Sequence, residues 1–228
     1  MSSVAYCISG EMRALDVWQT HISNIISPYD ADVFLHTWNR GIAGSSDDPF
    51  KERHGWSPYV YSNFEALAII NPKSFLVEDK KNLVVDYCSE IERQPEWAHL
   101  VPRERCFYMW RSWYYSYLIS NFRKPYDVII KTRTDLLYDS KIDVDLNSME
   151  SGTVYIPDRN DSNGYCDWFA MGKHDAMSVY CSLYLKVGDY MKQNVPLHPE
   201  IMLKHHLNSN NISVKRFDHK WSLHRTFI

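Results

Sequence analysis

The sequence predicts an α/β fold, in which a mixed, mostly parallel central sheet is flanked by helices. Two patterns support this prediction: short apolar runs recur along the chain, and stretches with apolar residues three and four positions apart separate them. The length of 228 residues, 45% of them hydrophobic and 23% charged, suits a single domain with a sizeable core. We therefore expect one domain over residues 1–228.

The first apolar runs, Val4 to Ile8 and Ala31 to His36, are typical of buried strands. Between them, residues 12–26 have helical periodicity, so the chain is expected to open with a βαβ unit. Glycine, serine and proline at 40–58 indicate an exposed loop. A helix near 62–70, a strand at 74–77 and a polar helix within 80–97 should follow.

The middle of the chain is rich in aromatic residues. Between Cys106 and Phe122, several of them recur three and four positions apart, as along one stripe of a helix. We expect that stripe to pack on the sheet, with Trp113 and Tyr115, which lie off it, as candidates for ligand contact. The β-branched run from Tyr126 to Lys131 predicts a strand. Further strands are expected at 153–156, 167–171 and 212–215, with helices at 174–187 and from 198.

Charge and composition exclude several classes of protein. The chain has 25 Lys and Arg against 28 Asp and Glu, a net charge of −3, which argues against a nucleic-acid-binding protein. The five cysteines form no C-x-x-C pair, and we interpret them as reduced thiols in a cytoplasmic protein. The start of the chain lacks the pattern of a signal peptide, and no run is long enough for a transmembrane helix. A lipid-linked substrate would require peripheral contact with a membrane.

Polar clusters follow the apolar strands, where ligands bind in open α/β sheets. They are Ser9 to Arg13, His36 to Trp38, Arg133 to Asp135, and Gly172 with Lys173. We expect them to converge on one site.

Common motifs are absent. No G-x-G-x-x-G, no P-loop and no G-x-S-x-G is present. The adjacent His205 and His206 cannot face one point, so we expect both at the surface and not at a metal ion.

Four strings, in order along the chain, resemble motifs of small nucleotide-sugar glycosyltransferases of the GT-A type, found in the polysaccharide-building gene sets of bacteria and large DNA viruses. Tyr126 to Leu136 resembles Y-D-x-[VI]-I-[RK]-x-R-x-D-[LI], and Val4 to Arg13 is similar to the opening strand with S-G-x-x-R. Asp32 to Trp38 resembles D-V-F-[IL]-H-T-W. Asp167 to Gly172 resembles D-x-F-A-[IM]-G, and Pro199-Glu200 the start of a late acidic helix.

The resemblance implies a GT-A-like fold with a nucleotide-binding half at about 1–135 and an acceptor-side half at about 136–228. GT-A enzymes place an Asp-x-Asp motif after a central strand, and its second carboxylate binds Mn²⁺ or Mg²⁺. Arg133 stands here in the first place and Asp135 in the second. Asp135 is thus the candidate metal ligand and Arg133 a candidate for the donor diphosphate. The alternative is an ion pair between the two.

The resemblance also suggests roles for other residues. Ser9, Gly10 and Arg13, the last expected one turn into the first helix, would contact the nucleotide. Glu200 is the candidate base for the acceptor hydroxyl, and Asp167 is the second candidate. The alternative for Glu200 is an acid in the first turn that interacts favourably with the helix dipole. His219 would be a further metal ligand, and Lys220, with His224 and Arg225, could neutralise the diphosphate.

Together these features predict a glycosyltransferase that moves a hexose or deoxyhexose from a nucleoside-diphosphate sugar (UDP- or GDP-sugar) to a glycan acceptor, with a divalent cation assisting departure of the diphosphate. Residues 40–58 and 158–165 would shape the acceptor side. One rival is a non-catalytic glycan- or nucleotide-binding domain with a GT-A-like fold. The absence of the first aspartate of the Asp-x-Asp motif favours this rival. Another is a methyltransferase, which the lack of a glycine-rich first turn disfavours. Donor, acceptor and stereochemistry cannot be read from these motifs.

Overall fold

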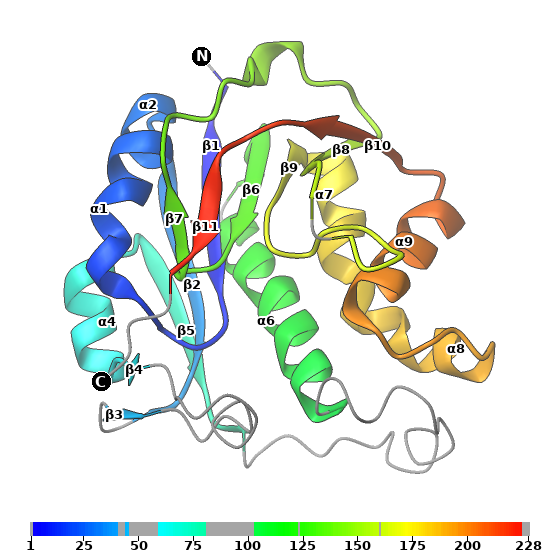
Figure 1. Ribbon diagram of the computed structural model, residues 1–228, viewed down its shortest axis with the longest axis horizontal. Coiled ribbons are helices and arrows are strands. Elements are labelled where there is room, and N and C mark those ends of the chain that lie inside the picture. The colour runs from blue at the N-terminus through cyan, green and yellow to red at the C-terminus, as the bar shows by residue number, and fades with distance from the viewer. Residues whose placement is uncertain are drawn as a thin grey trace.

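The central feature of the computed structural model is a seven-stranded sheet in the order β10-β8-β9-β6-β1-β2-β5 (Figure 1). The structure describes residues 2–40, 44–45, 59–80, 103–122, 124–159 and 161–224. β6, β1, β2 and β5 are parallel to one another, and β8 is parallel to β10. β9 is antiparallel to both β6 and β8. The predicted α/β fold with a mixed, mostly parallel sheet flanked by helices is confirmed.

The strands of this sheet are β1 (Val4–Ser9), β2 (Asp32–Trp38), β5 (Ser74–Glu78), β6 (Val128–Thr132), β8 (Thr153–Pro157), β9 (Ala170–Lys173) and β10 (Ser213–Phe217). Short antiparallel pairs are β7 (Leu136–Tyr138) with β11 (Trp221–Leu223), and β3 (Gly44–Ser45) with β4 (Tyr59–Val60). The α-helices are α1 (Trp18–His21), α2 (Ser27–Tyr29), α4 (Asn63–Ile70), α6 (Arg103–Asn121), α7 (His174–Cys181), α8 (Val187–Lys192) and α9 (Pro199–Ser209). A π-helical segment spans Ile22–Ile26, and 3₁₀ turns span Leu15–Val17, Leu146–Ser148 and Ser182–Lys186.

Helices cover both faces of the sheet around β1. All six residues of β1 are buried, as expected for a strand with a covered face on each side. Tyr6 contacts Trp18 of α1, while the next residue, Cys7, lies under Ser120 of α6. Successive side chains of a strand point to opposite faces, so α1 and α6 lie on opposite sides of the sheet. α6 packs along β1, β2 and β5.

The antiparallel direction of β9 changes the predicted site. Lys173, at the carboxyl end of β9, pairs with Val128 at the start of β6, so Gly172 and Lys173 lie at the edge opposite the other polar clusters. Residues 167–169, predicted as strand, instead precede β9. Asp167 therefore falls at the same edge as the end of β6. Strand direction depends on which neighbours pair, which a local apolar run does not specify.

The first helical segment begins later than predicted. The chain is extended at Arg13, which forms an antiparallel bridge with Val60, and Ala14 has a left-handed φ of 50°. Helical structure starts only at Leu15. Arg13 is therefore a loop residue before the helix, and the prediction that it lies one turn into a helix was wrong.

The prediction that His205 and His206 both lie at the surface was wrong for His206. On α9, His206 is buried, and its ring bonds to the Tyr190 hydroxyl (2.8 Å) and the Val179 carbonyl (2.7 Å). Burial lowers the pKa of His206 to about 4. Adjacent helix positions point in directions about 100° apart, so one histidine of the pair enters the core.

Several predictions lie largely or wholly outside the described residues: most of the loop at 40–58, all but the first residue of the helix within 80–97, and residues Cys88 and Arg225. The four described cysteines, Cys7, Cys106, Cys166 and Cys181, are buried and form no disulfide. Among the helices that the structure describes, none combines the length and the apolar character needed to cross a membrane.

Candidate functional site

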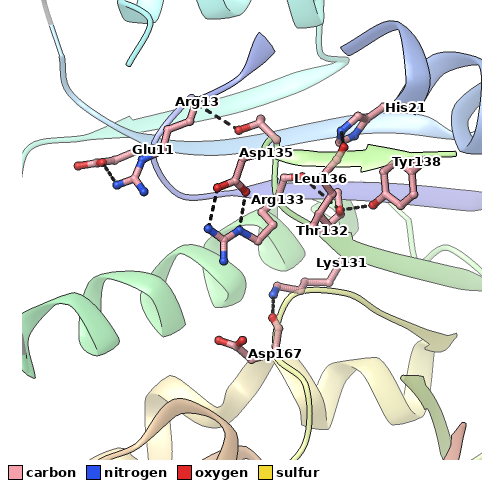
Figure 2. A network of polar contacts seen from close by, with 11 residues as sticks. Glu11, Arg13, His21, Lys131, Thr132, Arg133, Asp135, Leu136, Tyr138 and Asp167 are labelled. Carbon is pink, nitrogen blue, oxygen red and sulfur yellow. Dashed lines mark hydrogen bonds and ion pairs between the residues drawn. The ribbon is translucent and has the colours of Figure 1, made fainter. Parts of the chain in front are cut away.

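The candidate site lies where β1 and β6 end at the same edge of the sheet (Figure 2). Residues 10–13 follow β1, residues 133–135 follow β6, and Asp167 precedes the antiparallel β9. Two hydrogen bonds join the segments: the Arg13 N–H donates to the Thr134 hydroxyl (3.2 Å), and the buried Lys131 ammonium donates to the Asp167 carbonyl. The edge thus collects side chains of both charges from three parts of the chain.

Arg133 and Asp135 form a bidentate ion pair after β6. Nε of Arg133 lies 2.6 Å from Oδ1 of Asp135, and the terminal guanidinium nitrogen lies 2.8 Å from Oδ2. The Asp135 side chain is 3% exposed, whereas that of Arg133 is 27% exposed. The guanidinium also lies over the ring of Trp168, 5.7 Å from its centroid. The ion pair between Arg133 and Asp135, which the sequence left open as the alternative to separate ligand-binding roles, is therefore present.

The turn after β1 supplies a second cationic cluster. Gly10 has a φ of 106°, which favours glycine, and its N–H donates to the His36 carbonyl (3.2 Å). Glu11 accepts from the Arg13 guanidinium (2.5 Å) and the Lys80 ammonium (2.8 Å). Burial would raise the pKa of Glu11, but these two cations lower it to about 2. Glu11 is therefore ionised at neutral pH.

Lys131 belongs to β6, and its side chain points from the strand toward Asp167 (Figure 2). Its side chain is buried, and its ammonium lies 4.0 Å from the ring centroid of Trp113. Burial lowers the pKa of Lys131 to about 8, although the nearby Asp167 opposes this shift. Trp113 is itself buried and stacks on Tyr180, so the expectation that Trp113 is open to a ligand was wrong.

Asp167 and Glu200 form an acidic side of the same edge. Burial and the charge of Glu200 raise the pKa of Asp167 to about 6, while Lys131 and Arg133 oppose this shift. Glu200 stands in the first turn of α9, where its carboxylate pairs with Nδ1 of His198 at 2.9 Å. That contact raises the pKa of His198. The charge of Glu200 therefore favours the protonated form of Asp167, the other carboxyl group predicted as a candidate base.

Gly164 allows the loop before β9 to approach the start of α9 closely. The N–H of Tyr165 donates to the Glu200 carbonyl (3.0 Å), and a Cβ atom on Gly164 would lie 2.0 Å from the Glu200 carbonyl carbon. Only glycine fits at this distance. The 158–165 stretch, expected on the acceptor side, thus holds the backbone of Glu200 in place.

His219 and Lys220 lie apart from the Arg133–Asp135 pair. β11 pairs with β7 so that Trp221 stands opposite Tyr138, and the His224 N–H donates to the Asp135 carbonyl (2.8 Å). His219, five positions before His224, contacts Tyr138 instead (ring centroids 6.0 Å apart). Lys220 is exposed. The structure brings together Gly10, Arg13, Arg133, Asp135, Asp167 and Glu200 with the buried Ser9, but it does not bring in His219 or Lys220.

The side chains that the structure describes at this edge do not by themselves fit a metal ion. No group of three or more His, Cys, Asp or Glu side chains suited to a metal ion occurs within the described ranges. Asp135 is the one carboxylate directly after β6, and both of its oxygens already accept from Arg133. Divalent cations of this kind require several oxygen ligands. We therefore derive no catalytic step through a metal ion.

Lys131, Glu11, Lys80 and His198 were not among the predicted site residues. A lysine within the apolar run from Val128 to Lys131 was the available signal, because a charge inside a buried strand needs a specific partner. His198 stands at the start of the predicted helix. Glu11 and Lys80 are far apart in sequence, and only the fold brings them together.

Comparisons with known proteins add a fold likeness. No family model matches the chain, and no curated protein matches it. A solved structure of the glycosyltransferase GlyE from Streptococcus pneumoniae TIGR4 is similar over 96% of this chain, with 9% sequence identity and a TM-score of 0.44. The chain spans about half, 46%, of the length of that protein. A likeness of this size carries no conclusion about activity.

Proposed function

We propose that this chain is a nucleotide-sugar glycosyltransferase of GT-A-like architecture, which moves a hexose or deoxyhexose from a nucleoside-diphosphate sugar to a glycan acceptor. The observation that carries the proposal is the division of charge at the sheet edge. Arg13, Lys80 and Arg133 supply three cations on one side, and Asp167 and Glu200 supply two carboxyl groups on the other.

The cationic side suits a diphosphate. Breaking the bond between a sugar and a diphosphate leaves additional negative charge on the leaving group, and fixed cations stabilise that charge. The donor therefore places its diphosphate beside Arg13 and Arg133. Gly10 lets the backbone turn at this point, since its φ of 106° is accessible to glycine without strain.

The acidic side suits proton removal from an acceptor hydroxyl. In an inverting transfer, a carboxylate takes this proton while the acceptor oxygen bonds to the anomeric carbon. Glu200 is the first candidate, because its carboxylate lies in the first turn of α9, 2.9 Å from Nδ1 of His198. Asp167 is the second, because its raised pKa of about 6 makes it a stronger base than an ordinary aspartate. The 158–165 loop would form part of the acceptor surface.

A binding panel tests the donor side. UDP, GDP, CDP, dTDP and their common sugar conjugates are added to the protein in a thermal unfolding assay, each with Mn²⁺, with Mg²⁺ and with EDTA. A ligand at 100 times its dissociation constant stabilises the folded state by about 2.7 kcal/mol. We expect one nucleotide class to raise the melting temperature. A panel in which none does so under any condition contradicts the proposal.

The rival is a non-catalytic domain that binds glycans or nucleotides. It would share the donor response but would not need a base at the acidic side. Glu200→Gln separates the two functions, because it keeps the size of the side chain and removes the carboxylate. We expect this variant to bind nucleotide like the wild type and to lose turnover of the donor.

A further inference from the structure

We infer that the Arg133 guanidinium, oriented by Asp135, is the cation that faces the leaving diphosphate, and that this site needs no divalent metal ion. The inference rests on the proposed function and names the device by which the donor site would work. Asp135 then acts as a positioning residue for Arg133 and not as a metal ligand.

The geometry of the ion pair orients the guanidinium. Asp135 is almost fully buried at 3% exposure, so it is a fixed anchor, and it holds one edge of the guanidinium through two short hydrogen bonds. The Trp168 ring covers a face of the same group. The remaining N–H groups of Arg133 have no hydrogen-bond partner among the described residues, and 27% of the side chain is exposed. Arginine can thus offer a second planar edge to phosphate oxygens while it stays bound to Asp135.

A metal ion at Asp135 would compete with this arrangement. Coordination would make Arg133 share a carboxylate oxygen with the metal ion and would place a second positive charge next to the guanidinium. The described residues supply no third metal-ligating group to offset that cost. The arginine already provides the charge that a cation would bring, in a position that needs no rearrangement.

Neighbouring charges support a metal-free donor site. The Arg13 N–H is bonded to Thr134, the residue between Arg133 and Asp135, so the two arginines come from adjacent segments (Figure 2). Lys80 adds a third cation through Glu11. Among these described residues, the cations Arg13, Lys80 and Arg133 outnumber Glu11 and Asp135, the two carboxylates that pair with them, which suits a diphosphate.

The transfer step balances without a metal ion. The bond between the anomeric carbon and the diphosphate oxygen breaks, and its electron pair stays on that oxygen, beside Arg133. The acceptor oxygen forms the new bond to the anomeric carbon, and its proton passes to the carboxylate of the acidic side. Each charge that develops has a fixed partner.

Calorimetric titration of UDP, GDP, CDP and dTDP into the full chain, in EDTA and in Mn²⁺, tests the inference. We expect the dissociation constant of the preferred nucleotide to differ by less than about threefold between the two conditions. Arg133→Gln should weaken binding by about tenfold or more, since a charge-assisted bidentate contact is lost. Asp135→Asn keeps an acceptor for one guanidinium N–H, so it should weaken binding in EDTA by only about threefold. Arg133→Lys, a point charge without the fork, should fall between them.

A paired variant guards against misfolding. Arg133→Gln alone leaves the buried Asp135 carboxylate without its partner, whereas Arg133→Gln with Asp135→Asn gives a neutral pair of similar shape. The double variant should also lose binding. If nucleotide binding requires Mn²⁺ or Mg²⁺ and is lost in Asp135→Asn, the inference is overturned, whereas the proposed function still stands. Failure of every nucleotide to bind in either condition overturns the proposed function itself.

Discussion

Replacement of Lys131 by methionine tests the reasoning about buried charge in this site. Lys131→Met keeps a chain of similar length against Trp113 but removes the ammonium group. In the folded protein, burial lowers the pKa of Lys131 to about 8, against 10.5 for an ordinary lysine. Between these values the unfolded chain binds more protons than the folded one. The wild-type free energy of unfolding should therefore rise with pH relative to that of the variant.

The size of the effect follows from the pKa difference. Each pKa unit corresponds to about 1.4 kcal/mol, so the full shift amounts to about 3 kcal/mol. The part that falls between pH 7.5 and 9.5 is about 2 kcal/mol. Other groups that titrate in this range are present in both proteins and cancel in the difference between them.

Urea unfolding at pH 7.5, 8.5 and 9.5 measures this difference. Lys192→Met, which removes an exposed lysine from the end of α8, is the matched control for the loss of one positive charge. We expect the wild type to gain stability over Lys131→Met as the pH rises. A difference that stays constant across the range would refute the claim that burial disfavours the charged form of Lys131.

Three further predictions concern groups around the site and the core. Because the folded pKa of Asp167 is raised, the stability of the wild type relative to Asp167→Asn should fall as the pH rises from about 4 to 6, again measured in urea. Because the pKa of the buried His206 is lowered to about 4, the wild type should lose about 3 kcal/mol more stability than His206→Gln between pH 6.5 and 4. Gly164→Ala should displace the start of α9 and reduce transferase kcat by about tenfold or more, with nucleotide binding kept. Gly152→Ala is the control, because Gly152 has a positive φ but no atom beyond its chain neighbours lies within 4 Å of the added Cβ, and this variant should keep the wild-type kcat. Equal kcat values for the two variants would show that the close approach of Gly164 to Glu200 does not matter for activity.

The elements that local pattern predicts well are those with one strong signal. The β-branched run ending at Lys131 and the apolar run from Val4 each form a strand at the centre of the sheet, because strands buried on both faces carry few polar residues. The helix over Cys106 to Phe122 was predicted from its stripe and extends back to Arg103.

What the sequence could not provide depends on pairing between distant segments. The antiparallel direction of β9 decides that Asp167 lies at the site and Lys173 at the opposite edge. The β7–β11 pair decides that His224, and not His219, stands opposite Asp135. Local composition predicts neither of these two pairings. A resemblance in motif order suggested His219 as a metal ligand, but order along the chain does not fix distances in space.

The most direct test of the central claim is turnover of a nucleotide sugar. The nucleotide sugar that best stabilises the protein is incubated with the wild type or with the Glu200→Gln variant. Each reaction contains either no acceptor other than water or a mixture of oligosaccharide acceptors. The release of free nucleoside diphosphate is measured by chromatography. We expect many turnovers per protein molecule for the wild type, and a turnover rate about a hundredfold lower in Glu200→Gln with donor binding unchanged. If the donor binds but is not cleaved with any acceptor, the proposal of a glycosyltransferase is contradicted and the non-catalytic binding domain is favoured.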